Sequence, residues 1–174
     1  MDNYINFVKQ YPFISASIQF AILGTLGECI ALWVKRKSLS IGWSFWTFIG
    51  KVLAWALLGI VVKLGFIGMK AFTLSIIAQG FMPEILKCGI GKAFLISLFT
   101  NIFFGPQMML FHRIEDNIIE GKWNFNNIQK AWMTLIWFWI PAHTLTFSLP
   151  THYQIGLAAI WGLVLGIILG TTKK

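Results

Sequence analysis

The sequence predicts an all-α integral membrane protein, a polytopic helix bundle with about five spans plus one short interfacial or re-entrant helix. The stretch 132–170 contains no Asp, Glu, Lys or Arg, whereas helices of water-soluble proteins carry a charged face. It is long enough for two membrane-spanning helices of about 20 residues each. Hydrophobic residues make up 57% of the 174 residues and charged residues 11%, against about 25% charged in soluble domains. We therefore expect a single integral membrane domain, 1–174.

Composition also limits the partners that the chain is expected to have. The net charge of +8 does not indicate nucleic acid in so apolar a chain, because Lys and Arg in membrane-protein loops set the orientation. Cys29 and Cys88 form no CxxC pair and the histidines lack metal spacing, so neither a disulfide nor a metal site is predicted. The N-terminus resembles neither a secretory signal nor a transit peptide. The expected partner is membrane lipid, with no cofactor.

The first two spans are expected to form a hairpin. The first covers about residues 12–34, because Pro12 suits the first turn of a helix and the basic residues 35–37 follow its end. The next loop is short, so the second span, about 43–66, must return antiparallel beside the first. Residues 67–90 have an apolar stretch too short to span, which favours an interfacial or re-entrant helix.

Prolines mark the remaining predicted spans. These spans cover about 92–112, 128–149 and 151–170. Pro106 and Pro141 are expected to kink the two helices that contain them. Pro150 is expected at the turn between the last two spans.

Five spans place the two termini on opposite faces of the membrane. The face that would hold the C-terminus carries Lys35, Arg36, Lys37, Arg113, Lys122, Lys130, Lys173 and Lys174. The other face carries Lys9, Lys70, Lys87 and Lys92, with Lys63 nearby. The positive-inside rule then places the first face in the cytoplasm or the mitochondrial matrix. We expect a bacterial inner membrane, or a mitochondrial inner or peroxisomal membrane in a eukaryote.

Charged residues inside the spans are the first candidates for function, because a charge in the membrane is costly. Glu28 and Lys51 lie at similar depths of the predicted hairpin, so they form either a functional pair or a structural ion pair that locks the hairpin. Arg113 is a third candidate, with a basic membrane anchor as the alternative reading. The acidic stretch 115–120 is expected to be a solvated helical turn.

Uncharged polar residues occur near the prolines of the later spans. Asn101 and Gln107 give the third span a polar side. His143 and Thr146 follow Pro141, where hydroxyl groups either repair the backbone hydrogen bonds that a proline breaks or line a polar path. Small residues repeat every four positions in the last span: Ala158, Gly162, Gly166 and Gly170. Such a face permits close helix contact, with a partner inside the chain or in a second copy.

Three parts of the chain contain short motifs, built mainly from proline, glycine and aromatic residues, that can be compared with those of a known family. They are Tyr4, Pro12 and Gly27-Glu28; Phe104-Gly105-Pro106; and Trp139-Ile-Pro141, Thr146-Phe147, Pro150, Gln154 and Trp161. These motifs resemble those of the Mpv-seventeen/peroxisomal membrane protein family. The chain has Glu28, Thr100-Asn101, Thr146 and Gln154 where that family has Asp, Asp-Gln, Asn and Arg. The resemblance implies a pore-forming or solute-handling membrane protein of undefined substrate rather than an enzyme.

The residues and the resemblance together favour a small channel or solute-permeation protein. Its polar interior is expected to comprise Glu28, Lys51, Asn101, Gln107, Arg113, His143 and Thr146. One alternative is a non-catalytic scaffold or assembly factor that works through the glycine face. A membrane enzyme with His112, Asp116 or His143 as general base is less favoured, because the sequence shows no nucleophile–base pair, metal motif or phosphate loop. We therefore expect no catalytic residues.

Overall fold

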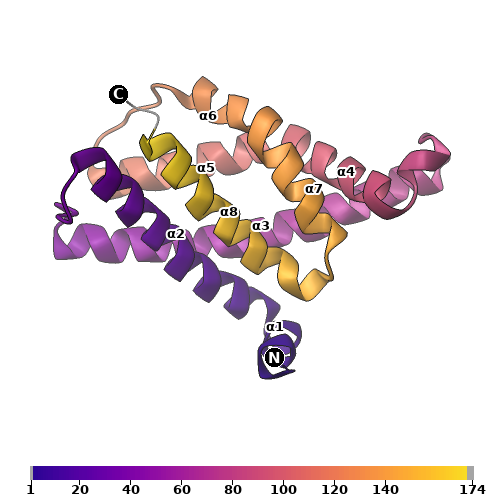
Figure 1. Cartoon of the computed structure of the whole chain (residues 1–174), viewed down its shortest axis with the longest axis horizontal. Coiled ribbons are helices and arrows are strands. Elements are labelled where there is room, and N and C mark those ends of the chain that lie inside the picture. The colour runs from indigo at the N-terminus through magenta and orange to yellow at the C-terminus, as the bar shows by residue number, and fades with distance from the viewer. Residues whose placement is uncertain (1, 172–174) are drawn as a thin grey trace.

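The computed structural model describes residues 2–171, and the regular secondary structure of this part is entirely helical (Figure 1). Four helical stretches in it are long and apolar enough to cross a membrane: Pro12–Arg36, Phe45–Ala78, Gly89–Glu120 and Thr151–Ile168. The protein is thus an all-α bundle with the character of an integral membrane protein. The prediction of five such spans is corrected to four by length and composition.

The predicted fourth span does form as a helical segment between the third and the last of these stretches. It consists of α6 (Ile128–Thr134), the π turn η3 (Leu135–Trp139) and α7 (Ile140–Ser148). The segment is less apolar than the four long stretches because Gln, Lys, His and Thr side chains interrupt it. This segment runs beside the four long stretches in the bundle (Figure 1), but it lacks their strong membrane-span character.

Helix α3 (Phe45–Ala78) is a single helix of 34 residues, about 51 Å long at 1.5 Å per residue. The prediction that residues 67–90 form a separate interfacial helix is therefore wrong for their first half. Residues 67–78 contain no proline, so the helix continues through them. Lys70 in this part turns inward and donates a hydrogen bond to Gln154. The chain leaves the helix near Gly80, whose φ is +79°, and then forms the short 3-10 helix η1 (Glu84–Leu86).

The third helical stretch contains a π turn just before a proline, as does the segment that follows it. It consists of α4 (Gly89–Phe99), η2 (Thr100–Phe104) and α5 (Gly105–Glu120), and Pro106 lies in the first turn of α5. Pro141 holds the same place in α7, directly after η3. A proline lacks the N–H group and clashes with the carbonyl four residues earlier. The wider π turn accommodates both defects at the places where the sequence predicted kinks.

Helix α2 (Pro12–Arg36) packs most extensively against α3 and α8 (Thr151–Thr171). The N-terminal helix α1 (Asp2–Gln10) lies across the start of α2 and α8, since Tyr4 Oη shares its one hydrogen between two acceptors, Gln19 Oε1 of α2 at 3.2 Å and the His152 carbonyl of α8 at 3.5 Å. Burial raises the pKa of the Tyr4 hydroxyl, so this group remains a donor. Helices α2 and α8 therefore run parallel, with both N-termini at one end of the bundle.

The small-residue face of α8 packs inside the chain. Ala158 is buried in the main core, and a Cβ atom added to Gly166 would lie 3.4 Å from the Gly27 carbonyl oxygen of α2. A Cβ atom added to Gly162 would meet no atom within 4 Å, because this residue borders a cavity. Gly170 lies within the bounds of α8, but its surroundings, like Lys173 and Lys174, are outside the described residues.

Candidate functional site

A cavity of about 300 Å³ lies at the centre of the bundle and is lined by residues from α2, α3, α8 and both proline-containing segments. Most of its wall is apolar. Four of the seven residues predicted for a polar interior line it, namely Glu28, Asn101, Arg113 and His143. Asn101 and Asp116 of the same helical stretch both border the cavity, about 22 Å apart along the helix axis at 1.5 Å per residue. The cavity therefore joins two separate polar groups.

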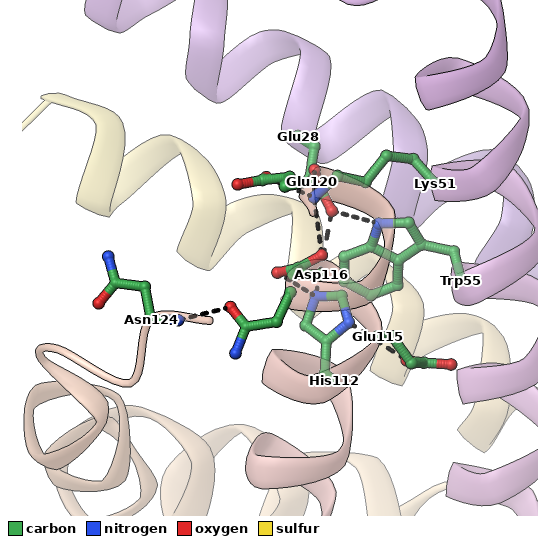
Figure 2. Close-up of polar contacts among 9 residues, drawn as sticks. Glu28, Lys51, Trp55, His112, Glu115, Asp116, Glu120 and Asn124 are labelled. Carbon is green, nitrogen blue, oxygen red and sulfur yellow. Dashed lines mark hydrogen bonds and ion pairs between the residues drawn. The ribbon is translucent and has the colours of Figure 1, made fainter. Parts of the chain in front are cut away.

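The first polar group is centred on Lys51, where α2, α3 and α5 meet (Figure 2). The Lys51 side chain is 4% exposed, and its Nζ lies 3.2 Å from Glu28 Oε2 and 2.7 Å from Asp116 Oδ1. Glu120 Oε1 is 3.4 Å from the same nitrogen. One ammonium group thus holds carboxylates of two other helices together. The predicted approach of Glu28 and Lys51 is present in the structure, with Asp116 as a closer partner.

Trp55 and His112 complete this Lys51 cluster. Trp55 Nε1 donates a hydrogen bond of 2.7 Å to Glu28 Oε1, and the Trp55 ring lies 4.6 Å from the His112 ring between centroids. His112 Nε2 is 3.9 Å from Asp116 Oδ2 and 4.0 Å from Glu28 Oε1. The imidazole therefore faces both carboxylates at distances longer than direct hydrogen bonds.

The acidic end of α5 differs in part from the solvated turn that the sequence predicted, because Glu115 and Asp116 are largely buried while Glu120 is exposed. Asp116 and Glu120 pair with Lys51, and Glu115 is only 9% exposed, with Oε2 3.5 Å from His112 Nδ1. The signal in the sequence was the spacing of His112, Asp116 and Glu120 by four residues, which places all three side chains on one helix face. His112 and Asp116 on that face turn toward α3, whereas the Glu120 side chain stays 53% exposed.

Glu28, His112 and Asp116 form the one group of potential metal ligands found in the described residues. Each offers one ligand atom, and these atoms lie within 4.8 Å of one another. Lys51 Nζ already contacts both carboxylates, so a metal ion would have to compete with a positive charge that the chain itself provides. The geometry therefore makes Lys51 the internal counter-ion of this group.

The second polar group joins the two proline-containing segments deep in the bundle. Asn101 Nδ2 lies 3.2 Å from His143 Nδ1 and donates to the Ser97 carbonyl at 2.8 Å. Ser97 Oγ in turn donates to the Ile140 carbonyl at 2.7 Å, across the same interface. Three aromatic rings surround the imidazole: Phe66, Trp139 and Phe147. The Asn101–His143 pair is therefore a polar contact enclosed by apolar surface.

The hydroxyl groups after Pro141 bond locally. Thr144 donates to the Ile140 carbonyl and Thr146 to the Ala142 carbonyl, each four residues earlier. Thr146 also accepts a 3.2 Å hydrogen bond from Trp161 Nε1 of α8. Thr146 is fully buried but does not line the cavity. The two bonds that these threonines donate are ordinary i→i−4 side-chain bonds. They do not reach the carbonyl before Pro141 that loses its N–H donor, because a proline removes the bond to a residue about four positions earlier.

Two other predicted interior residues have different surroundings. Gln107 is exposed on the outer face of α5, which corrects its predicted interior position. A helix turns about 100° per residue, so side chains six positions apart, such as Asn101 and Gln107, point in directions about 120° apart. Arg113 is partly buried and borders the cavity near the Lys51 cluster.

Comparisons with protein-family models, with curated proteins and with solved structures gave no match for this chain.

Proposed function

We propose that this membrane protein binds a small solute in its central cavity and conducts it between the two ends of the bundle, without catalysis. The observation that carries the proposal is the course of the cavity, which runs from the Lys51 cluster to the Asn101–His143 pair. The resemblance to the Mpv-seventeen/peroxisomal membrane protein family, with its expected solute-handling role, forms part of the same proposal. The proposal also places the protein in a bacterial inner membrane, or in a mitochondrial inner or peroxisomal membrane.

The free-energy cost of placing polar side chains inside a membrane supports this proposal. Charged and polar side chains at membrane depth are expensive and mark solute or ion pathways. Here they border open space rather than filling a packed interface, and the cavity volume of about 300 Å³ suits a small molecule. A wall that is mostly apolar with polar groups at both ends favours a small solute that combines an apolar body with a polar group.

Gly162 offers a direct test, because it borders the cavity and has room for a side chain. Gly162→Leu should fill the cavity without displacing a neighbouring helix. We expect the variant to insert and fold like the parent but to lose solute flux in liposomes, measured with a panel of small solutes. Gly68→Leu is the matched control, since Gly68 of α3 is exposed and also has no atom within 4 Å of an added Cβ.

Flux that is present in the parent and unchanged in Gly162→Leu would contradict conduction through this cavity. Absence of flux for every solute in the parent would favour the scaffold alternative. That alternative has weaker support, because the small-residue face that it requires is already packed against Gly27 of α2 in the same chain. Self-association through this face would therefore have to displace an internal contact.

A further inference from the structure

A second, smaller cavity lies at the end of the bundle where α2 and α8 begin. Its volume is about 200 Å³. It is lined by Val8, Lys9, Pro12, Lys63, Thr151 and His152. None of these residues borders the central cavity. This basic pocket is therefore a separate site, and the proposed solute path does not account for it.

Lys63 is the most informative residue of the basic pocket. It is 8% exposed, and the described residues include neither an ion pair nor a hydrogen-bond partner for its ammonium group. A lysine this deeply buried normally has a carboxylate partner, as Lys51 of the same helix does. Lys63 instead contributes its charge to the wall of an open pocket. Its ammonium group therefore remains available to an anion from outside the chain.

The surroundings of Lys63 add positive potential to the pocket. Pro12 begins the 25-residue helix α2 and Thr151 begins the 21-residue helix α8, so two helix N-termini converge there. Each N-terminus carries a partial positive charge and N–H groups without partners inside the helix. Lys9 supplies a second ammonium group and His152 an imidazole, whereas no carboxylate lines the pocket. Converging helix N-termini with basic side chains are a typical setting for phosphate.

We propose that the basic pocket binds a phosphate group, with Lys63 as the principal charged contact. The same chemistry is available from a phospholipid headgroup and from free inorganic phosphate. The position of the pocket favours a lipid, since it lies where two candidate membrane spans begin. Basic pockets between membrane helices are known binding sites for anionic lipid headgroups.

The test uses the detergent-solubilised full chain and measures its thermal unfolding with three additives. These are phosphatidylglycerol, phosphatidylcholine and inorganic phosphate. We expect phosphatidylglycerol to raise Tm in a saturable manner. In Lys63→Met the apparent affinity for this lipid should fall about tenfold or more, the loss expected for one charge-assisted contact. Lys122→Met is the matched control, because Lys122 is exposed in the loop at the opposite end of the bundle.

Each outcome decides the proposal. Stabilisation by inorganic phosphate as well, lost in Lys63→Met, would support the phosphate site and identify free phosphate as a ligand. Equal stabilisation by phosphatidylcholine, or an unchanged lipid response in Lys63→Met, would overturn it. If Lys63→Met does not fold, the Lys9→Gln variant replaces it, since the exposed Lys9 side chain has no role in the core. An unchanged lipid response in that variant would count against the pocket.

Discussion

Lys51 and Lys63 lie on the same helix, 12 residues or about 18 Å apart, yet their surroundings differ in charge. Lys51 contacts three carboxylates from two neighbouring helices. Lys63 has no such partner in the described residues and lines the basic pocket. The first lysine is therefore balanced inside the chain, whereas the second depends on an external anion. Because of this difference in partners, we interpret Lys51 as a structural charge and Lys63 as a candidate binding residue.

Replacing Lys51 with Met tests the structural role of its ammonium group. The substitution leaves Glu28 and Asp116 facing each other without a counter-ion. Removing one partner of a buried ion pair typically costs about 3–5 kcal/mol, so we expect a loss of that order in detergent unfolding. Because the remaining carboxylates repel each other, Lys51→Met combined with Asp116→Asn should recover part of the lost stability. Parent-like stability of the single variant would show that the Lys51 cluster does not hold the helices together.

The sequence predicted one half of the Lys51 cluster and missed the other half for a physical reason. A short loop joins the helices that contain Glu28 and Lys51. The depth of each residue in the hairpin therefore follows from its distance in sequence from that loop. The pairing of Lys51 with Asp116 spans 65 positions and depends on how α5 is rotated against α3. The η2 π turn contributes to that rotation, and the hydrophobic pattern did not indicate it. The same uncertainty in helix rotation led to the wrong position for Gln107.

Among the helices, glycines determine how closely α2 and α3 approach each other. A Cβ atom on Gly59 would lie 2.5 Å from the Ala16 carbonyl oxygen, and one on Gly24 would overlap the Trp55 ring. Close contact of backbones is a common basis of helix association in membranes. The register of this hairpin also places Glu28 beside Lys51 and Trp55. Helix packing therefore determines the geometry of the candidate site.

The substitution Gly59→Ala tests this contact at the level of the helix pair. The added methyl group must push α2 away from α3, because its nearest neighbour is backbone rather than a flexible side chain. Overpacking of this kind costs about 1–3 kcal/mol. Gly68→Ala on the same helix meets no atom within 4 Å and should be neutral or stabilising, since Ala has the higher helix propensity. Equal effects in detergent unfolding would contradict a close α2–α3 crossing.

Helix boundaries were predictable where the chain carries a turn signal. Pro12 begins α2 and Pro150 separates α7 from α8, as the sequence indicated. The end of α3 was predicted 12 residues too early, because residues 67–90 were assigned to a separate interfacial or re-entrant helix. Residues 67–78 contain no proline and permit a helix, and the contact of Lys70 with Gln154 ties this part of α3 to α8. A contact between residues so far apart in the chain has no local signature.

On the scale of the whole molecule, the polar groups divide between the two ends of the bundle. The Lys51 cluster lies near the loops 37–44 and 121–127, because it joins the start of α3 to the end of α5. The basic pocket lies at the opposite end, where α2 and α8 begin. The central cavity meets the first end through Glu28 and Asp116. A protein with this arrangement presents different chemistry to the two sides of a membrane.

The orientation of these ends can be tested with a cysteine that the chain already has. Cys88 is exposed in the connection between α3 and α4, whereas Cys29 is buried in α2. Ser38→Cys, made together with Cys88→Ser, moves the exposed thiol to the loop before α3, at the other end of the bundle. Because that end carries more Lys and Arg, the positive-inside rule places it in the cytoplasm or matrix.

A membrane-impermeant maleimide applied to intact cells or mitochondria should therefore label Cys88 in the parent and spare Ser38→Cys until the membrane is permeabilised. Asn126→Cys, also with Cys88→Ser, should behave like Ser38→Cys, because the loop 121–127 lies at the same end of the bundle. Labelling of Ser38→Cys and Cys88 from the same side would contradict a transmembrane α3. Opposite labelling with the sides exchanged would keep the bundle but reverse its orientation, and the basic pocket would then face the cytoplasmic leaflet.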